Sequence, residues 1–336
     1  MNLLSKKIKI KKEILFDAFF ILSGFFIFLL SWSYLRDESI SIFLIESISF
    51  VDQLGAFGTY IFEMVTLIGI EELFILFLFP ILYWMGSKKA VVKSILALLF
   101  GVTVTFFIRY YLNLPGPHIP RLGISRPGSS FPSGHVVQFI MVFGVLFYHY
   151  QNRILKYFIV FYLLFLGFLR IATGYHFLDD VVFGVLLAAF LLLVFQNLFS
   201  FFSEKIDYIF YMWLSLLIGL PITIILFVGD FARHNILLFY FFGFLTGYLL
   251  SRGTDSFIEP SCCFERRFKF IAGIIITFPY LFGYLFVTRF LGMGPSFSFR
   301  YITFFIFGFF VTFAWPYIFD KLRKLINYLV LNQEKE

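Results

Sequence analysis

The sequence predicts an all-α polytopic membrane protein. Of its 336 residues, 60% are hydrophobic and only 14% are charged, whereas a soluble domain has about 45–50% apolar and about 25% charged residues. The mean hydropathy is +0.91. The apolar residues also fall in blocks of about 18–22, roughly the length of helix that crosses a bilayer core. A transmembrane β-barrel would show short alternating segments instead.

About ten membrane-spanning helices are expected along the chain. The first apolar stretch follows a lysine-rich start, but it is too long for a signal-peptide core and lacks a small-residue cleavage site, so we expect it to be retained. Residues 38–69 carry four carboxylates, which are costly in lipid, and are expected to form interfacial or partly re-entrant helices on the outer side. The expected spans are 14–35, 71–86, 91–109, 136–150, 154–171, 178–199, 207–228, 235–251, 270–291 and 302–319.

The distribution of lysines predicts the orientation. Alternating the spans from a cytoplasmic N-terminus places nearly all lysines on the cytoplasmic side, where such residues collect in membrane proteins. Both termini are therefore expected in the cytoplasm, and the loops 110–135 and 172–177 emerge together on the outer face. The net charge of +7 is explained in this way, so we expect no nucleic-acid partner.

Three short stretches in the middle of the chain carry nearly all of the chemistry: 109–117, 132–135 and 170–180. Transfer of a phosphoryl group without a metal needs a nucleophile, a partner that orients it, a proton donor for the leaving oxygen and a positively charged cradle. The three stretches contain these residue types, and the predicted topology brings them to one face of the membrane.

The third stretch supplies a candidate nucleophile. His176 and Asp180 are four residues apart where a helix should begin, so they lie on one face of that helix. The carboxylate can accept a hydrogen bond from one imidazole nitrogen and leave the other free to attack phosphorus. Arg170 precedes them, and its planar guanidinium can hold phosphate oxygens in a bidentate manner.

The second stretch supplies the remaining groups. Ser133 and Gly134 are expected at the N-terminus of the following helix, where backbone N–H groups point at an anion and glycine permits close approach. His135 is then placed to protonate the leaving oxygen. Taken singly, His135 could be an interfacial histidine, Asp180 a helix cap and Arg170 a headgroup anchor. Their joint occurrence at a membrane boundary favours function.

The second and third stretches resemble two signatures of the type 2 phosphatidic acid phosphatase superfamily. It comprises membrane lipid phosphatases, with relatives among soluble acid phosphatases and vanadium haloperoxidases. The resemblance covers about residues 57–200 and implies a six-helix core. It implies that His176 is the nucleophile that forms a phosphohistidine, that Asp180 orients it and that His135 is the general acid. The phosphate-binding residues that it implies are Arg170, Ser133 and Gly134.

The first stretch departs from the family signature, which is a lysine, six residues and then arginine-proline. Here Arg109 stands for the lysine and Gly116 for the arginine. Arg109 keeps a cation and is expected to bind phosphate. We expect Arg126, rather than Arg121, to supply the missing guanidinium. Leu169 replaces the serine that opens the third signature, which costs at most one hydrogen bond to phosphate.

These observations lead to a division into three parts. We expect residues 1–56 to form a transmembrane helix and an outer interfacial segment, 57–200 the catalytic core, and 201–336 a four-helix membrane extension. No further cluster of titratable groups suited to catalysis follows residue 200.

The expected function is metal-independent removal of a terminal phosphate from a membrane lipid phosphate at the outer face. By resemblance, the candidate substrates are a polyprenyl diphosphate, phosphatidic acid or phosphatidylglycerol phosphate. A lipid phosphotransferase, in which an alcohol replaces water, shares the same first half-reaction. A non-catalytic lipid-phosphate binder or transporter is the alternative from another class, but it has no need to keep two histidines and a carboxylate. A haloperoxidase would require vanadate and a soluble context.

No metal and no cofactor is expected. Cys262 and Cys263 are adjacent, and two cysteines alone form neither a zinc site nor a favourable disulfide. The expected partners are the lipid substrate and the bilayer, with the oligomeric state left open. The expected location is the cytoplasmic membrane of a prokaryote.

Overall fold

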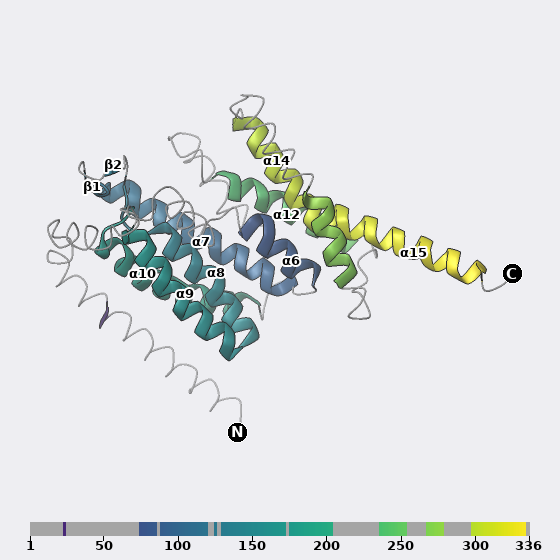
Figure 1. Cartoon of the computed structure of the whole chain (residues 1–336), viewed down its shortest axis with the longest axis horizontal. Coiled ribbons are helices and arrows are strands. Elements are labelled where there is room, and N and C mark those ends of the chain that lie inside the picture. Colours follow the sequence, from purple (N-terminus) through teal and green to yellow (C-terminus); the bar gives the residue numbers. More distant parts are fainter. Residues whose placement is uncertain are drawn as a thin grey trace, which may run out of the picture. The chain divides into compact units, whose positions relative to one another are not determined.

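The computed structural model describes residues 23–24, 74–85, 88–119, 124–125, 129–172, 175–203, 235–253, 267–278 and 297–333 (Figure 1). The expected outer segment 38–69 and the expected span 207–228 lie outside these ranges, as does most of the span expected at 14–35.

The prediction of an all-α membrane protein is confirmed. Four described helical segments are long and apolar enough to cross a membrane: 90–112, 153–172, 178–197 and 301–325. The total of about ten spans stays a prediction. The described helices are η2 (Phe74–Leu78), α6 (Phe79–Trp84), α7 (Lys88–Leu112), α8 (Gly134–Tyr150), α9 (Arg153–Ala172), α10 (Leu178–Ser203), α12 (Asn235–Gly253), α14 (Phe297–Phe309), η4 (Phe310–Ala314) and α15 (Trp315–Gln333), together with a helix at 267–278.

A small antiparallel sheet lies in the loop between α7 and α8 (Figure 1). It consists of β1 (His118–Ile119) paired with β2 (Ile124–Ser125), and a further bridge joins Pro115 to Ser129. Strands of two residues are too short to give an alternating pattern, so the sequence did not predict them. The pairing brings the two ends of the loop together.

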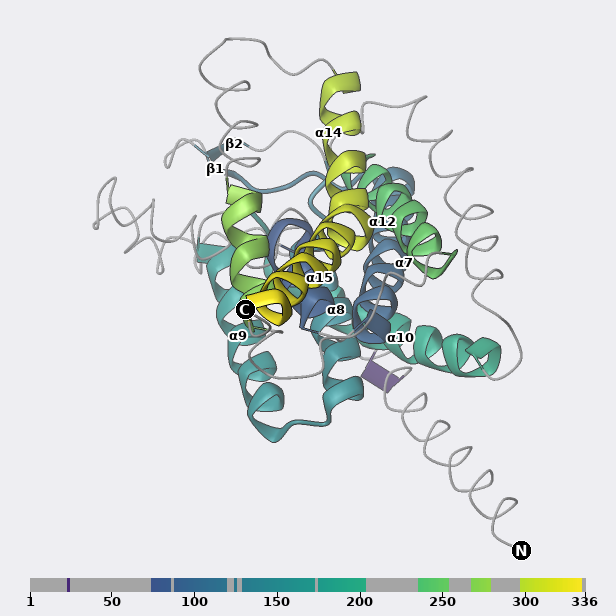
Figure 2. The same cartoon turned by 90° about the vertical axis from the view of Figure 1, so that its right-hand side faces the viewer.

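The chain divides into two compact units. In its described part, the first unit contains α7 from Lys93 onward together with α8, α9 and α10. The described part of the second unit contains η2, α6, the first residues of α7 and the helices that follow residue 234. Figures 1 and 2 show α8 beside α9 and α10 in the first unit and α12 beside α14 in the second.

Close packing of α10 against the start of α8 positions the site in the first unit. A Cβ atom at Gly184 of α10 would lie 3.2 Å from the Ser133 carbonyl oxygen, so glycine permits the two backbones to approach. The Phe183 ring packs beside the Phe131 ring, with centroids 4.6 Å apart. These contacts hold the residues just before α8 on the N-terminal turns of α10.

The second unit is held by close helix contacts and by buried side-chain hydrogen bonds. Gly243 and Gly308 permit α12 and α14 to pack backbone to backbone. The Thr312 hydroxyl donates to the Phe244 carbonyl at 3.0 Å, and the Trp84 indole N–H donates to the Val311 carbonyl at 3.0 Å. Such bonds satisfy polar groups that would be costly if left unpaired in an apolar interior.

Candidate active site

The structure brings the three chemistry-bearing stretches together at one end of the first unit. The Ser130 N–H donates to the Leu114 carbonyl at 3.1 Å, which joins the two ends of the α7–α8 loop. The Ser133 N–H donates to the Asp180 carbonyl at 3.0 Å, which joins that loop to the start of α10. Residues separated by tens of positions in sequence thus form one cluster.

His176 and Asp180 form a buried pair at the start of α10. The His176 Nδ1 atom lies 3.3 Å from Asp180 Oδ2, and the side chains are 5% and 0% exposed. The same carboxylate oxygen accepts a hydrogen bond from the Phe177 N–H at 3.0 Å. Asp180 therefore both caps the helix start and holds the imidazole, and these two roles fix the ring relative to α10.

Arg170 approaches the other nitrogen of His176. Its Nη2 atom lies 3.4 Å from His176 Nε2, and its side chain is buried. A guanidinium can only donate hydrogen bonds, so Nε2 must carry the lone pair in this contact. The proton is then on Nδ1, facing Asp180. This is the tautomer that a histidine nucleophile attacking through Nε2 requires.

Burial keeps the His176 ring neutral. It lowers the pKa of His176 well below the usual range, and the positive charges of Arg170 and Arg109 lower it further. A hydrogen bond with the Ser130 backbone acts in the opposite direction. Because burial is the largest cause, the imidazole stays uncharged near neutral pH.

This environment predicts the pH response of His176. In the unfolded chain the ring should take up a proton near pH ~6.5, whereas the folded protein should not bind that proton until the pH falls well below this value. The unfolded state thus binds more protons below pH ~6.5, so acidification through this window should reduce stability. NMR titration of isotope-labelled histidine rings should leave His176 neutral at pH ~6, and the signal is assigned by its loss in His176→Gln. Protonation at or above pH ~6.5 would contradict the prediction.

Arg109, at the C-terminal end of α7, braces the loop that precedes α8. Its Nε and Nη2 atoms donate to the Pro132 carbonyl at 3.0 and 2.7 Å, and Nη2 also lies 3.5 Å from the Ser130 carbonyl oxygen. A Cβ atom at Gly134 would lie 3.3 Å from Nη2, so glycine leaves room for the guanidinium. Arg109 is in the site as expected, but these donors face backbone carbonyls, and its contact with phosphate stays a prediction.

Ser133 is the N-cap residue of α8. Its side chain is fully buried, and its hydroxyl has no hydrogen-bond partner among the described residues. The serine N–H is already used by the Asp180 carbonyl. The group that Ser133 offers to a ligand is therefore its hydroxyl. Gly134 and His135 occupy the first turn of α8, where N–H groups lack intrahelical partners, and the His135 side chain is partly exposed.

The identity of the arginine that replaces the one missing from the first stretch stays a prediction. Gly116 is buried in the described part of the loop. Arg121 and Arg126 both lie outside the described residues, as do Cys262 and Cys263. The structure therefore does not decide between the two arginines.

Sequence reasoning missed one side chain that belongs to this cluster. The Tyr175 ring covers the Arg170 guanidinium, with 4.3 Å from Cζ to the ring centroid. No sequence signal distinguishes this residue among the chain's 19 tyrosines. Tyr175 lies directly before His176 and five residues after Arg170. This position indicates a contact with Arg170 only once the geometry of the site is known.

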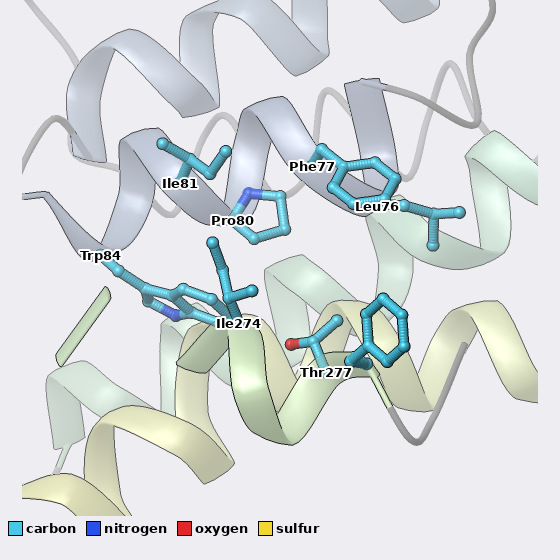
Figure 3. Close-up of a pocket in the computed structure, with 8 residues that line it drawn as sticks. Leu76, Phe77, Pro80, Ile81, Trp84, Ile274 and Thr277 are labelled. Carbon is cyan, nitrogen blue, oxygen red and sulfur yellow. The ribbon is translucent and has the colours of Figure 1, made fainter. Parts of the chain in front are cut away.

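Other described features do not suggest a second reaction centre. Within the described ranges, no three His, Cys, Asp or Glu side chains gather in a way that could hold a metal ion. An apolar pocket in the second unit lies between the η2–α6 segment and the helix at 267–278 (Figure 3). Its polar side chains are Thr277, whose hydroxyl donates to the Gly273 carbonyl at 2.7 Å, and Trp84. Such a lining does not suit phosphate.

Comparison with known families matches residues 90–204 to the family described as the PAP2 superfamily. Comparison with curated proteins and with solved structures gave no match. The matched segment contains the His176–Asp180 pair, Arg170, Arg109 and the start of α8. Members of this superfamily are mostly phosphatases, so the match supports phosphoester hydrolysis in general. Residues 90–204 thus match the PAP2 superfamily, and this match supports the resemblance to the type 2 phosphatidic acid phosphatases.

Proposed function

We propose that the protein is a metal-independent lipid phosphatase that removes a terminal phosphate from a membrane lipid phosphate or a polyprenyl diphosphate through a phosphohistidine intermediate. One observation carries the proposal: a buried histidine is held between a carboxylate at Nδ1 and a guanidinium at Nε2. That arrangement leaves a neutral nucleophile beside a phosphate-binding cation. We further propose that residues 57–200 form the catalytic core, flanked by the segments 1–56 and 201–336.

The first half-reaction begins when Arg170 exchanges its contact with His176 Nε2 for hydrogen bonds to the phosphate. Phosphate oxygens take the N–H donors of Arg170, so the lone pair of His176 Nε2 is released and attacks phosphorus. The bond between phosphorus and the leaving oxygen breaks, and His135 gives that oxygen a proton. Asp180 stabilises the positive charge that develops on the imidazole ring. Ser133 contributes its buried hydroxyl, which has no partner among the described residues, to a phosphate oxygen.

The second half-reaction returns the enzyme to its starting state. Water attacks the phosphorus of the phosphohistidine, and His135, now unprotonated, accepts the water proton. The bond between phosphorus and Nε2 breaks, its electron pair returns to Nε2, and inorganic phosphate leaves. Each half-reaction thus uses His135 once, first as an acid and then as a base.

The membrane setting supports a lipid as the substrate. The site lies at the ends of α7, α9 and α10, each of which includes a segment long and apolar enough to span a bilayer. Tyr110 and Tyr111, directly after Arg109, are 62% and 77% exposed, and tyrosine is enriched at membrane–water interfaces. The lysine asymmetry supports an outer-face site with both termini in the cytoplasm. We further propose that the membrane is the cytoplasmic membrane of a prokaryote.

The proposal is tested by phosphate release from purified protein in detergent with a chelator present. The panel contains phosphatidic acid, phosphatidylglycerol phosphate and a polyprenyl diphosphate, with His176→Ala as the inactive control. We expect at least one lipid to be hydrolysed by the wild-type protein only. Transfer of the phosphoryl group to an added alcohol, detected as a new phosphate ester without release of inorganic phosphate, would identify a phosphotransferase. Binding of a lipid phosphate without turnover under either condition would identify a non-catalytic binder.

The role of His135 can be separated from that of His176 by changing the leaving group. We expect His135→Ala to lose roughly 10²–10⁴-fold in kcat/KM with an alkyl phosphate, because kcat/KM reports the first half-reaction, in which the leaving alkoxide must be protonated. The loss should be much smaller with a nitrophenyl phosphate, whose leaving group departs without a proton. Steady-state kinetics with both substrates measures this difference. Equal losses for the two substrates would remove His135 from the role of general acid.

A further inference from the structure

We infer that Tyr175 is a positioning residue that holds the Arg170 guanidinium and thereby sets the affinity of the site for a phosphoryl group. The inference rests on the proposed function. The Tyr175 ring centroid lies 4.3 Å from Arg170 Cζ, within the range of an attractive cation–π contact. The Arg170 side chain is buried, so bulk water contributes little to its orientation.

The geometry of the two groups explains why a ring suits this place. The donors of a guanidinium lie in its plane and point outward from its edges. An aromatic ring attracts the whole cation, and a ring that lies against the guanidinium face uses none of those donors. Arg170 can then direct Nη2 at His176 Nε2 and still offer N–H groups to phosphate oxygens. A carboxylate partner would hold the arginine equally well, but it would occupy the donors and repel the substrate.

Backbone contacts bring Tyr175 to this position. The N–H groups of Tyr175 and His176 both donate to the Arg170 carbonyl at 3.1 Å. These two bonds hold Tyr175 and His176 close to Arg170, with the ring over the guanidinium and the nucleophile beside it. These two bonds involve no Tyr175 side-chain atom, so changing that side chain should leave the path of the loop in place.

Loss of the ring should loosen Arg170 and weaken the binding of phosphate. A cation–π contact changes an equilibrium by roughly 3-fold at exposed sites to roughly 30-fold where the groups are desolvated. We expect Tyr175→Leu to weaken competitive inhibition by inorganic phosphate by a factor in that range. KM should rise by a similar factor and kcat should change less, because Arg170 contacts phosphate both before and during the reaction.

A graded series tests the contact itself. Tyr175→Phe keeps the ring and should retain nearly wild-type phosphate affinity. A trifluorinated phenylalanine at position 175 keeps almost the same shape but reverses the charge distribution on the ring face, so its affinity should fall towards that of Tyr175→Leu. Folding of each variant is checked by its elution in detergent and its helical circular dichroism.

The outcomes separate this inference from the proposed function. Wild-type affinity in Tyr175→Leu would overturn the role of Tyr175, and so would equal affinities in the phenylalanine and trifluorinated variants. A loss in Tyr175→Phe as large as that in Tyr175→Leu would assign the effect to the hydroxyl and overturn it too. If the wild-type protein neither hydrolyses a lipid phosphate nor binds inorganic phosphate, the proposed function fails, and this inference fails with it.

Discussion

Replacing His176 by alanine is expected to abolish turnover while the protein stays folded and inserted in the membrane. In the proposed mechanism this side chain supplies the atom that forms the bond to phosphorus, and it contacts both Arg170 and Asp180. Loss of a nucleophile removes the two-step path altogether, so kcat should fall by about 10⁴-fold or more. Phosphate release from the best lipid of the panel measures the loss.

A matched control separates loss of chemistry from loss of structure. His149 lies at the opposite end of α8 from the site and is exposed, so His149→Ala should keep wild-type activity. A covalent phosphoenzyme, trapped during turnover by quenching in alkaline denaturant because phosphohistidine is acid-labile, should form in the control and be missing in His176→Ala. Activity of His176→Ala within tenfold of wild type would remove His176 from the role of nucleophile.

Replacing Arg170 should produce the second largest loss. Removal of one donor from a preorganised anion site typically costs about 10²–10³-fold in rate, and Arg170 also contacts His176. We expect Arg170→Ala and Arg170→Lys to lose similar amounts of kcat/KM, since an ammonium lacks the planar, bidentate geometry of guanidinium. Steady-state kinetics with the best lipid measures both variants.

The two variants should differ in their effect on the nucleophile. Arg170 lowers the pKa of His176 through its positive charge, so Arg170→Ala should raise that pKa. Arg170→Lys keeps the charge and should raise it less. NMR titration of the histidine rings measures this shift. Arg153→Ala is the control, because Arg153 is exposed at the other end of α9. Wild-type kcat/KM in Arg170→Lys would show that charge alone suffices and would contradict the bidentate role.

The sequence alone determined the features that depend on local composition and short spacing. Apolar runs identify membrane helices because the bilayer acts on each segment separately, and the described helices at 88–112, 153–172 and 178–203 cover the spans expected there. The four-residue spacing of His176 and Asp180 predicted their contact. His176 lies two residues before α10 begins rather than within the helix, but the short separation still keeps both side chains at the helix start. The family resemblance also rests on such short motifs.

Only the tertiary structure decided how groups from distant segments share their hydrogen bonds. Arg109 was expected to bind phosphate, yet its described donors hold the carbonyl of Pro132, 23 residues away. The Ser133 N–H was expected to face an anion, yet it donates to Asp180. Tyr175 gave no sequence signal, because covering a guanidinium needs no particular spacing. Each partner is set by the packing of α7, α8 and α10, and that packing depends on shape across the whole first unit rather than on any one motif.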